Sequence, residues 1–153
     1  LSSSSAASDV YKRQEYYRNG KVKIKEEYEE GKLLNIIICQ DSLGVNLPFG
    51  TIKEGNGTVI SYSEDGGKSA VGTYKDGVPD GNWKYFYENG KISGTGKFSD
   101  GNKNGHWVFY NKTSGKKEAE GDYTNDRLTG VWKFYNEDGT FKNAKNYDAE
   151  DDE

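Results

Sequence analysis

The chain has 153 residues, a net charge of −4 and a mean hydropathy of −1.00. Only 32% of its residues are hydrophobic, and 3 Trp, 12 Tyr and 6 Phe supply much of that fraction. This composition excludes a conventional aliphatic core and a membrane-spanning helix, which needs about 18 consecutive apolar residues. It does not exclude a folded chain, because each aromatic side chain can bury about 150 to 250 Å².

The acidic excess is concentrated at the C-terminal end. Residues 148–153 form an acidic tail, and the rest of the chain is almost neutral. Because there is no basic stripe, the charge does not favour nucleic acid as a partner, and it does not indicate membrane contact either. A small-molecule substrate is not indicated by any motif.

The first fourteen residues are set apart from the fold. Residues 9–14 can be back-translated into the transposase end sequence used to prepare sequencing libraries. We therefore predict that residues 1–14 are a non-native leader derived from a sequencing adapter; the alternative is a natural leader rich in Ser and Ala. On either interpretation, these residues do not tell whether the protein has a signal peptide, so they do not predict its location.

The chain from residue 15 to residue 147 is predicted to be one repeat domain. The copies share a Gly-x-Trp-x-aromatic-aromatic pattern followed by a turn glycine, and the Trp residues are Trp83, Trp107 and Trp132. A degenerate copy has Val59 in the Trp position, and a clipped copy begins at Tyr16. In every copy an aromatic residue stands eight positions after the turn glycine, as in Gly90 and Phe98. Such regular offsets indicate a repeat architecture.

Each copy is predicted to be a β-hairpin. Asn19-Gly20, Asp65-Gly66, Asn89-Gly90 and Asp138-Gly139 suit a two-residue type I′ turn, in which both central residues have positive φ. A second set of turns lies between the hairpins, at Asp76-Gly77, Asp100-Gly101 and Asn125-Asp126. Successive hairpins should therefore stack side by side into a meander.

The hairpin register divides the aromatic residues between two faces. Counting outward from Asn89-Gly90 places Trp83 opposite Gly96, so that the indole can cover bare backbone within its own hairpin. Period-2 alternation then gives one face a structural aromatic row, which we expect to be the core of a curled sheet. This row contains Trp83, Trp107, Trp132, Phe98 and Tyr123.

The opposite face is polar except for one aromatic position in each copy. Those positions form a stripe of candidate partner-binding residues: Tyr62, Phe86, Tyr110 and Tyr135. Apolar surface on an otherwise polar face is typical of a binding ridge, although packing across the strands explains the stripe equally well.

The segment from about residue 32 to residue 53 interrupts the period. It begins with an apolar, β-branched run ending at Cys39, continues through a turn up to Gly44, and contains Pro48 in its second half. We predict an inserted hairpin whose second strand lies at an edge or is bulged, because Pro cannot donate to a ladder. Packing is its expected role, and a partner-binding strand is the alternative.

The predicted fold is therefore all-β: an elongated, single-layer antiparallel meander of about five hairpins with one inserted hairpin. The repeat resembles the bacterial variant of the MORN repeat, as found in antitoxins of the YwqK family. That resemblance implies a non-enzymatic module that contacts proteins or membranes, in some cases by neutralising a toxin.

The residues that carry catalytic chemistry are sparse. A single His and a single Cys, His106 and Cys39, lie far apart in sequence and cannot supply a histidine-rich metal site. We therefore expect no enzyme, no cofactor and no metal, and a protein partner as the ligand. The alternative function is contact with the cell envelope or a ligand, through choline, glycan or lipid on the aromatic rows, although one Trp per repeat leaves a choline cage incomplete.

Overall fold

The computed structural model describes residues 9–148, and this part of the chain contains β-strands and no α-helix. Period-2 alternation and closely spaced turn residues account for the short strands. The strands are β1 (Val10–Tyr16), β2 (Val22–Glu29), β3 (Lys32–Cys39), β4 (Gly57–Tyr62), β5 (Lys68–Lys75), β6 (Val78–Pro79), β7 (Gly81–Phe86), β8 (Ile92–Ser99), β9 (Asn102–Lys103), β10 (Gly105–Tyr110), β11 (Lys117–Thr124), β12 (Arg127–Tyr135) and β13 (Phe141–Asn146).

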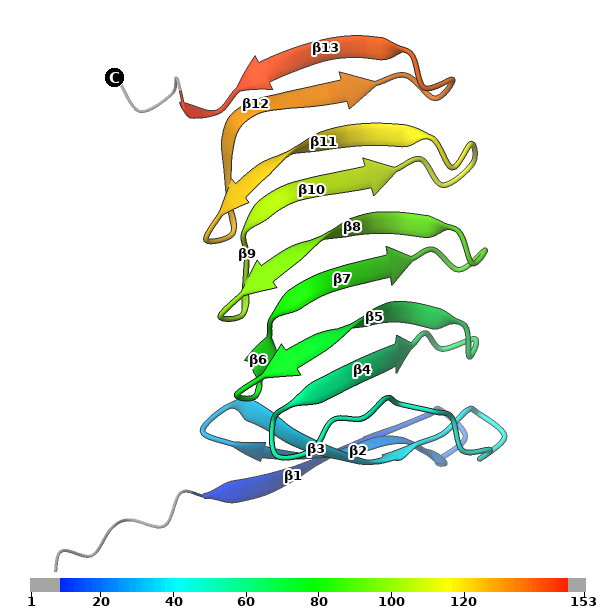
Figure 1. The fold of residues 1–153 in the computed structure, drawn as a ribbon. Helices are drawn as coiled ribbons and strands as arrows, with labels where there is room; N and C mark the ends of the chain where they lie inside the picture. The colour runs from blue at the N-terminus through cyan, green and yellow to red at the C-terminus, as the bar shows by residue number, and fades with distance from the viewer. Residues whose placement is uncertain (1–8, 149–153) are drawn as a thin grey trace, which may run out of the picture.

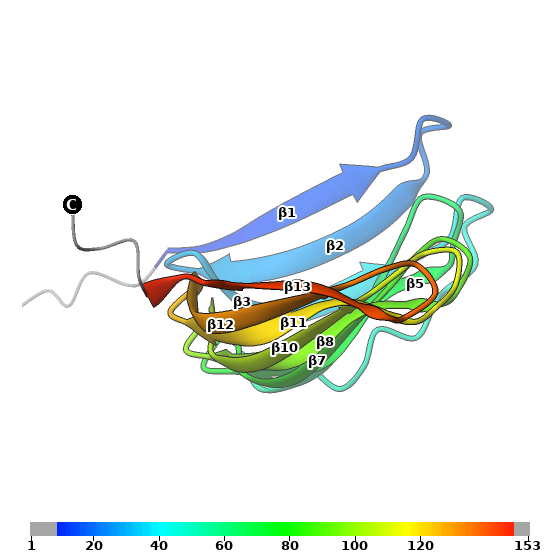
Figure 2. The same cartoon turned by 90° about the horizontal axis from the view of Figure 1, so that it is seen from above.

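The strands form two antiparallel sheets. The first has the order β1-β2-β3, and the second, of ten strands, runs from β13 through β12, β11, β10, β8, β7 and β5 to β4, with β6 and β9 as short additions to β5 and β8. Figure 1 shows the hairpins of the second sheet stacked in chain order. Seen along the stack, the ten-stranded sheet is curved, and β1 and β2 lie to one side of it (Figure 2). The predicted open meander of antiparallel hairpins is confirmed.

The turns that connect the two strands of each hairpin differ from the predicted type. In the hairpin of β7 and β8, Gly90 has φ of 80°, but Asn89 does not have a positive φ. The Gly90 N–H donates to Tyr87 O at 2.9 Å, and a bulge follows between Tyr85 and Phe86. This geometry is a type I turn followed by a left-handed glycine, so the predicted type I′ turn was wrong.

Type I′ geometry occurs at the other end of the sheet, in the tight turns between hairpins. Both residues have positive φ at Asp76-Gly77, at Asp100-Gly101 and at Asn125-Asp126. Asn and Asp tolerate this left-handed conformation better than most residues, which explains why they precede or replace glycine there.

Beyond the bulge, the predicted register holds: Trp83 pairs with Gly96 and Gly81 with Phe98. The indole, however, covers a different glycine. A Cβ atom built on Gly72 would lie 2.1 Å from Trp83 Cδ2, whereas the ring over Gly96 belongs to Trp107. Each indole therefore covers the preceding hairpin instead of its own, and the prediction of its position was wrong.

An opening between neighbouring hairpins explains where the indole goes. After the tight turn, β6 pairs with β5, but the chain leaves β5 at Gly81, where φ is 86°, and pairs with it again only at Lys84. The side chain of Trp83 fills this opening opposite Gly72 and donates from Nε1 to Thr73 O at 3.1 Å.

The same arrangement recurs at the next two junctions. Trp107 Nε1 donates to Lys97 O at 3.1 Å, and Trp132 Nε1 donates to Asp122 O at 3.0 Å. We call these three sites the indole junctions. Each one therefore adds a side-chain contact between two hairpins to the backbone pairing that also joins them.

The segment expected to form an inserted hairpin has a strand, a turn and an irregular return. Its first arm, β3, pairs with β2 along its whole length, and the chain turns at Asp41–Gly44, where Gly44 N donates to Asp41 O. The second arm makes only isolated bridges, such as Gln40 with Asn46 and Gly50 with Val59, so it is not a strand. Pro48 and the change of direction towards β4 account for the difference.

This segment nevertheless keeps the contacts that neighbouring repeats make elsewhere. Tyr17 Oη donates to Gln40 O at 2.8 Å, just as Tyr87 Oη donates to Tyr110 O at 2.7 Å. The side chain of Asn35 accepts from the Glu54 N–H at 3.0 Å, as that of Asn104 accepts from the next tight turn. The segment therefore occupies the place of one repeat in the stack.

Two clusters of buried side chains form the core. An aliphatic cluster of Leu33, Ile36, Cys39, Ile52 and Val59 joins the two sheets. An aromatic cluster along the ten-stranded sheet contains Ala70, Trp83, Phe98, Trp107 and Trp132.

The ends of the chain lie partly outside the described residues. Of the predicted leader, residues 1–8 lie outside them, whereas Val10–Gln14 belong to β1 and pair with β2. Most of the predicted acidic tail, residues 149–153, also lies outside them. The origin of the leader stays a prediction.

Candidate interaction surface

The stripe residues of the polar face lie at the ends of strands, just before the turns within the hairpins. Tyr62, Phe86, Tyr110 and Tyr135 are all half-buried, and each is at a bulge. Their surroundings divide them into two pairs, which the sequence did not distinguish.

The outer pair is engaged by neighbouring residues. Tyr62 Oη donates to Pro48 O at 2.6 Å, and its ring packs against the aliphatic cluster. Tyr135 Oη donates to Glu120, and its ring meets Phe141 edge to face with centroids 6.2 Å apart. Within the part of the chain that the structure describes, Phe86 has no ring partner and the Tyr110 hydroxyl has no hydrogen-bond partner. The central pair is therefore the freer part of the stripe.

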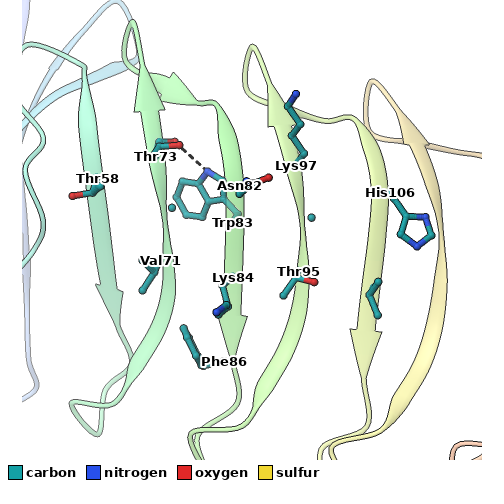
Figure 3. Close-up of a pocket in the computed structure, with 13 residues that line it drawn as sticks. Thr58, Val71, Thr73, Asn82, Trp83, Lys84, Phe86, Thr95, Lys97 and His106 are labelled. Atoms are coloured by element: carbon teal, nitrogen blue, oxygen red, sulfur yellow. Dashed lines mark hydrogen bonds between the residues drawn. The ribbon is translucent and has the colours of Figure 1, made fainter.

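A groove of about 600 Å³ lies beside Phe86 on the same face. It crosses the strands from Thr58 on β4 to Val108 on β10, and Figure 3 shows its side chains, with Trp83 set between β5 and β7. The groove lies over the indole junctions, and Gly72, Gly96 and the indole of Trp83 line it there.

The side chains of the groove form a cross-strand row. Val71 pairs with Lys84, Lys84 with Thr95, and Thr95 with Val108. Val71, Val108 and Phe86 make its apolar part, and the stems of the lysines add to it. The result is a largely apolar lining that also carries two lysines, Lys84 and Lys97.

The two lysines of the groove, Lys84 and Lys97, are exposed. Among the residues that the structure describes, neither has a carboxylate within ion-pair distance, whereas Lys117 lies 2.8 Å from Glu120 on the same sheet. In the sequence these lysines do not differ from other polar-face residues. Only the register, which places Lys84 beside Thr95 and Lys97 beside Asn82, indicates that they lie close together.

Acidic groups mark the end of the groove at β11. His106 Nδ1 lies 3.0 Å from Asp122 Oδ1, and His106 Nε2 lies 3.3 Å from Glu120 Oε2. Hydrogen bonds from Lys117, Tyr135 and His106 to the Glu120 carboxylate lower its pKa to about 2. Glu120 is therefore ionised and already well partnered, so it offers little to an incoming ligand.

Apart from the indole of Trp83, which also lines the groove, the structural aromatic row lies on the opposite face, where its side chains pack mainly against one another. Trp107 is 0% exposed, Trp83, Trp132 and Phe98 are buried, and Tyr123 is half-buried. The Phe98 and Trp107 rings meet edge to face with centroids 5.3 Å apart. Lys103 Nζ lies 5.0 Å from the centres of both the Trp107 and Tyr123 rings, where a ligand cation would have to bind.

The groups with catalytic potential are dispersed. Cys39 is buried in the aliphatic cluster, and burial raises the pKa of its thiol, while His106 lies on the ten-stranded sheet. Residues 9–148 contain no group of three or more His, Cys, Asp and Glu side chains placed to hold a metal ion. No helix in the same range is long and apolar enough to span a membrane.

Fold and surface together define a repeat protein of stacked hairpins with an apolar groove on one face. The comparison with protein families agrees: the family described as MORN repeat variant matches residues 12–30 and 79–100. Each match covers one hairpin, β1 with β2 in the first case and β7 with β8 in the second. MORN repeats are typically non-enzymatic modules that contact proteins or membranes. No curated protein matches the chain.

Proposed function

We propose that the protein is a non-enzymatic scaffold that binds a partner protein through the polar face of its ten-stranded sheet. The observation that supports this most directly is the apolar groove beside Phe86, on a face whose other exposed groups are mostly polar. Half-buried aromatic side chains next to a concave apolar surface are typical anchors of protein interfaces. Phe86 and Tyr110 are the proposed anchors, and Tyr62 and Tyr135 flank them.

An antitoxin role is the finer form of this proposal. It rests on the resemblance of the repeat to that of the YwqK-family antitoxins, and it requires the partner to be a toxin. A toxin gene next to the gene for this chain would support it, and co-expression of that toxin with the protein would test it by cell survival.

A photo-crosslinking experiment tests the scaffold proposal. A photoreactive phenylalanine analogue replaces Phe86 or Tyr110 in turn, and the protein is irradiated in an extract of the cells that produce it. We expect a discrete protein adduct from both positions, which mass spectrometry then identifies. Position 16 is the matched control, because Tyr16 is 57% exposed but lies on β1, in the other sheet.

Capture by variants completes the test. Phe86→Ala combined with Tyr110→Ala should abolish binding of the identified partner, while circular dichroism and thermal unfolding stay close to those of the parent. Tyr11→Ala combined with Tyr16→Ala removes two equally aromatic, more exposed side chains from β1, in the other sheet, and should leave binding intact. Equal capture by the two double variants would refute the proposal. Flotation with lipid vesicles at physiological salt, in the absence of an adduct, would instead favour membrane contact.

A further inference from the structure

We propose that the groove binds an extended acidic segment of a partner protein, with carboxylates of that segment held by Lys84 and Lys97. This inference rests on the proposed scaffold function and adds the chemistry of the partner. The groove lies on the polar face, and the proposed anchor Phe86 is one of its lining residues.

The dimensions of the groove fit a single extended peptide. The groove crosses β4, β5, β7, β8 and β10, which are neighbours in the sheet. With strands about 4.8 Å apart, it is about 19 Å long, and an extended chain rises about 3.3 Å per residue. Six or seven residues of partner therefore span it.

The side chains of the groove fit alternating apolar and acidic residues. Val71 and Val108 lie at the two ends of the cross-strand row, and Phe86 lies beside it. Lys84, between the two valines, supplies the cation, and Lys97 lies on the adjacent strand. An extended segment with apolar side chains towards the floor can direct its carboxylates to these two ammonium groups.

The charges around the groove favour an acidic partner over a basic one. Lys84 and Lys97 have no carboxylate partner among the residues that the structure describes, so a bound carboxylate displaces no existing ion pair. The carboxylates of Glu120 and Asp122, on β11 beyond β10, contact His106. A basic segment would place like charges together over β7 and β8, which reduces affinity.

Titration of synthetic peptides into the isotopically labelled full chain, followed by amide NMR shifts, tests this inference. The probe is a capped heptapeptide in which glutamate and valine alternate; the matched peptides carry glutamine or lysine in place of glutamate. We expect the glutamate peptide to shift the amides of Lys84, Thr95 and Val108 and to bind more tightly than either matched peptide. Its affinity should fall as salt is raised.

Charge-removing variants localise the effect. Lys84→Gln with Lys97→Gln removes two ion pairs with the glutamate peptide. Because exposed ion pairs contribute little free energy, we expect binding to weaken by between about two-fold and thirty-fold. Lys133→Gln with Lys142→Gln removes the same charge from exposed positions on β12 and β13 and should leave the affinity unchanged.

Four results would overturn the inference: no shifts at millimolar peptide, shifts outside the groove, equal binding of the three peptides, or equal weakening by the two double variants. Flotation with anionic vesicles that is lost in the Lys84 and Lys97 variant would overturn it in favour of a lipid headgroup. If a partner adduct forms at Phe86 but any of these four peptide results is obtained, the scaffold function is supported and only the proposal of an acidic segment is rejected.

Discussion

The indole junction at Gly96 and Trp107 should behave as a single energetic unit. An alanine Cβ at position 96 would lie 2.0 Å from Trp107 Cδ2 and 2.2 Å from Cε2, whereas carbon atoms in contact lie about 3.5 to 4.0 Å apart. In the Gly96→Ala variant, the indole of Trp107 must therefore leave its site, in which it is 0% exposed. It then loses its hydrogen bond to Lys97 O. Overpacking of this kind costs about 1 to 3 kcal/mol.

Removing the indole should reverse the sign of the glycine substitution. Trp107→Ala alone should cost about 3 to 5 kcal/mol. Gly96 does not have a left-handed φ, so in the Trp107→Ala background Gly96→Ala should stabilise by about 0.4 to 1 kcal/mol through the unfolded state. The expected coupling free energy is therefore between about 1.4 and 4 kcal/mol.

Urea unfolding of the four proteins in this double-mutant cycle measures the coupling. Gly67→Ala is the control, because its nearest neighbour would be Asp65 at 3.4 Å and it lies away from Trp107. Its effect should be the same in both backgrounds within about 0.5 kcal/mol. The reasoning is refuted if Gly96→Ala has the same cost whether or not Trp107 is present.

Two further predictions concern hydrogen bonds of the stack. Tyr87→Phe removes the donor to Tyr110 O and should lower the free energy of unfolding by about 0.5 to 1.5 kcal/mol, while Tyr85→Phe, whose hydroxyl has no such acceptor in the described range, should have little effect in the same urea titrations. The pKa of Glu120 falls from 4.5 to about 2 on folding, so its stabilising contribution is fully present above pH 4.5 and is lost as the pH falls towards 2. Glu120→Gln should flatten the fall of Tm over that window; parallel curves for the two proteins would contradict the role of this carboxylate.

Much of the fold could be predicted because the repeat ties residue type to position. The offset from Gly90 to Phe98 and the pairing of Trp83 with Gly96 follow from alternation within one hairpin. The turn type could not be predicted in the same way. Asn-Gly suits both a type I′ turn and a type I turn with a following left-handed glycine, and the two differ in the φ of Asn89 and in the residue that pairs with Lys91.

The position of the indole depends on neighbouring hairpins, which a single-hairpin argument does not include. Only after the chain leaves β5 at Gly81 does an opening exist into which Trp83 fits. The groove has the same origin, and for that reason Lys84 and Lys97 looked like ordinary polar-face residues. Their lack of carboxylate partners, within the described residues, depends on distances that the sequence does not contain.

The shape of the molecule follows from where an indole is missing. Three successive hairpins carry Trp at the junction position and stack with a steady curvature, whereas β4 has the much smaller Val59 there. Val59 packs instead against Ile52 and β3 in the aliphatic cluster, and at that point the chain changes from one sheet to the other (Figure 2). The curved stack of hairpins therefore coincides with Trp at the junction position, and the change from one sheet to the other coincides with its replacement by a short aliphatic side chain.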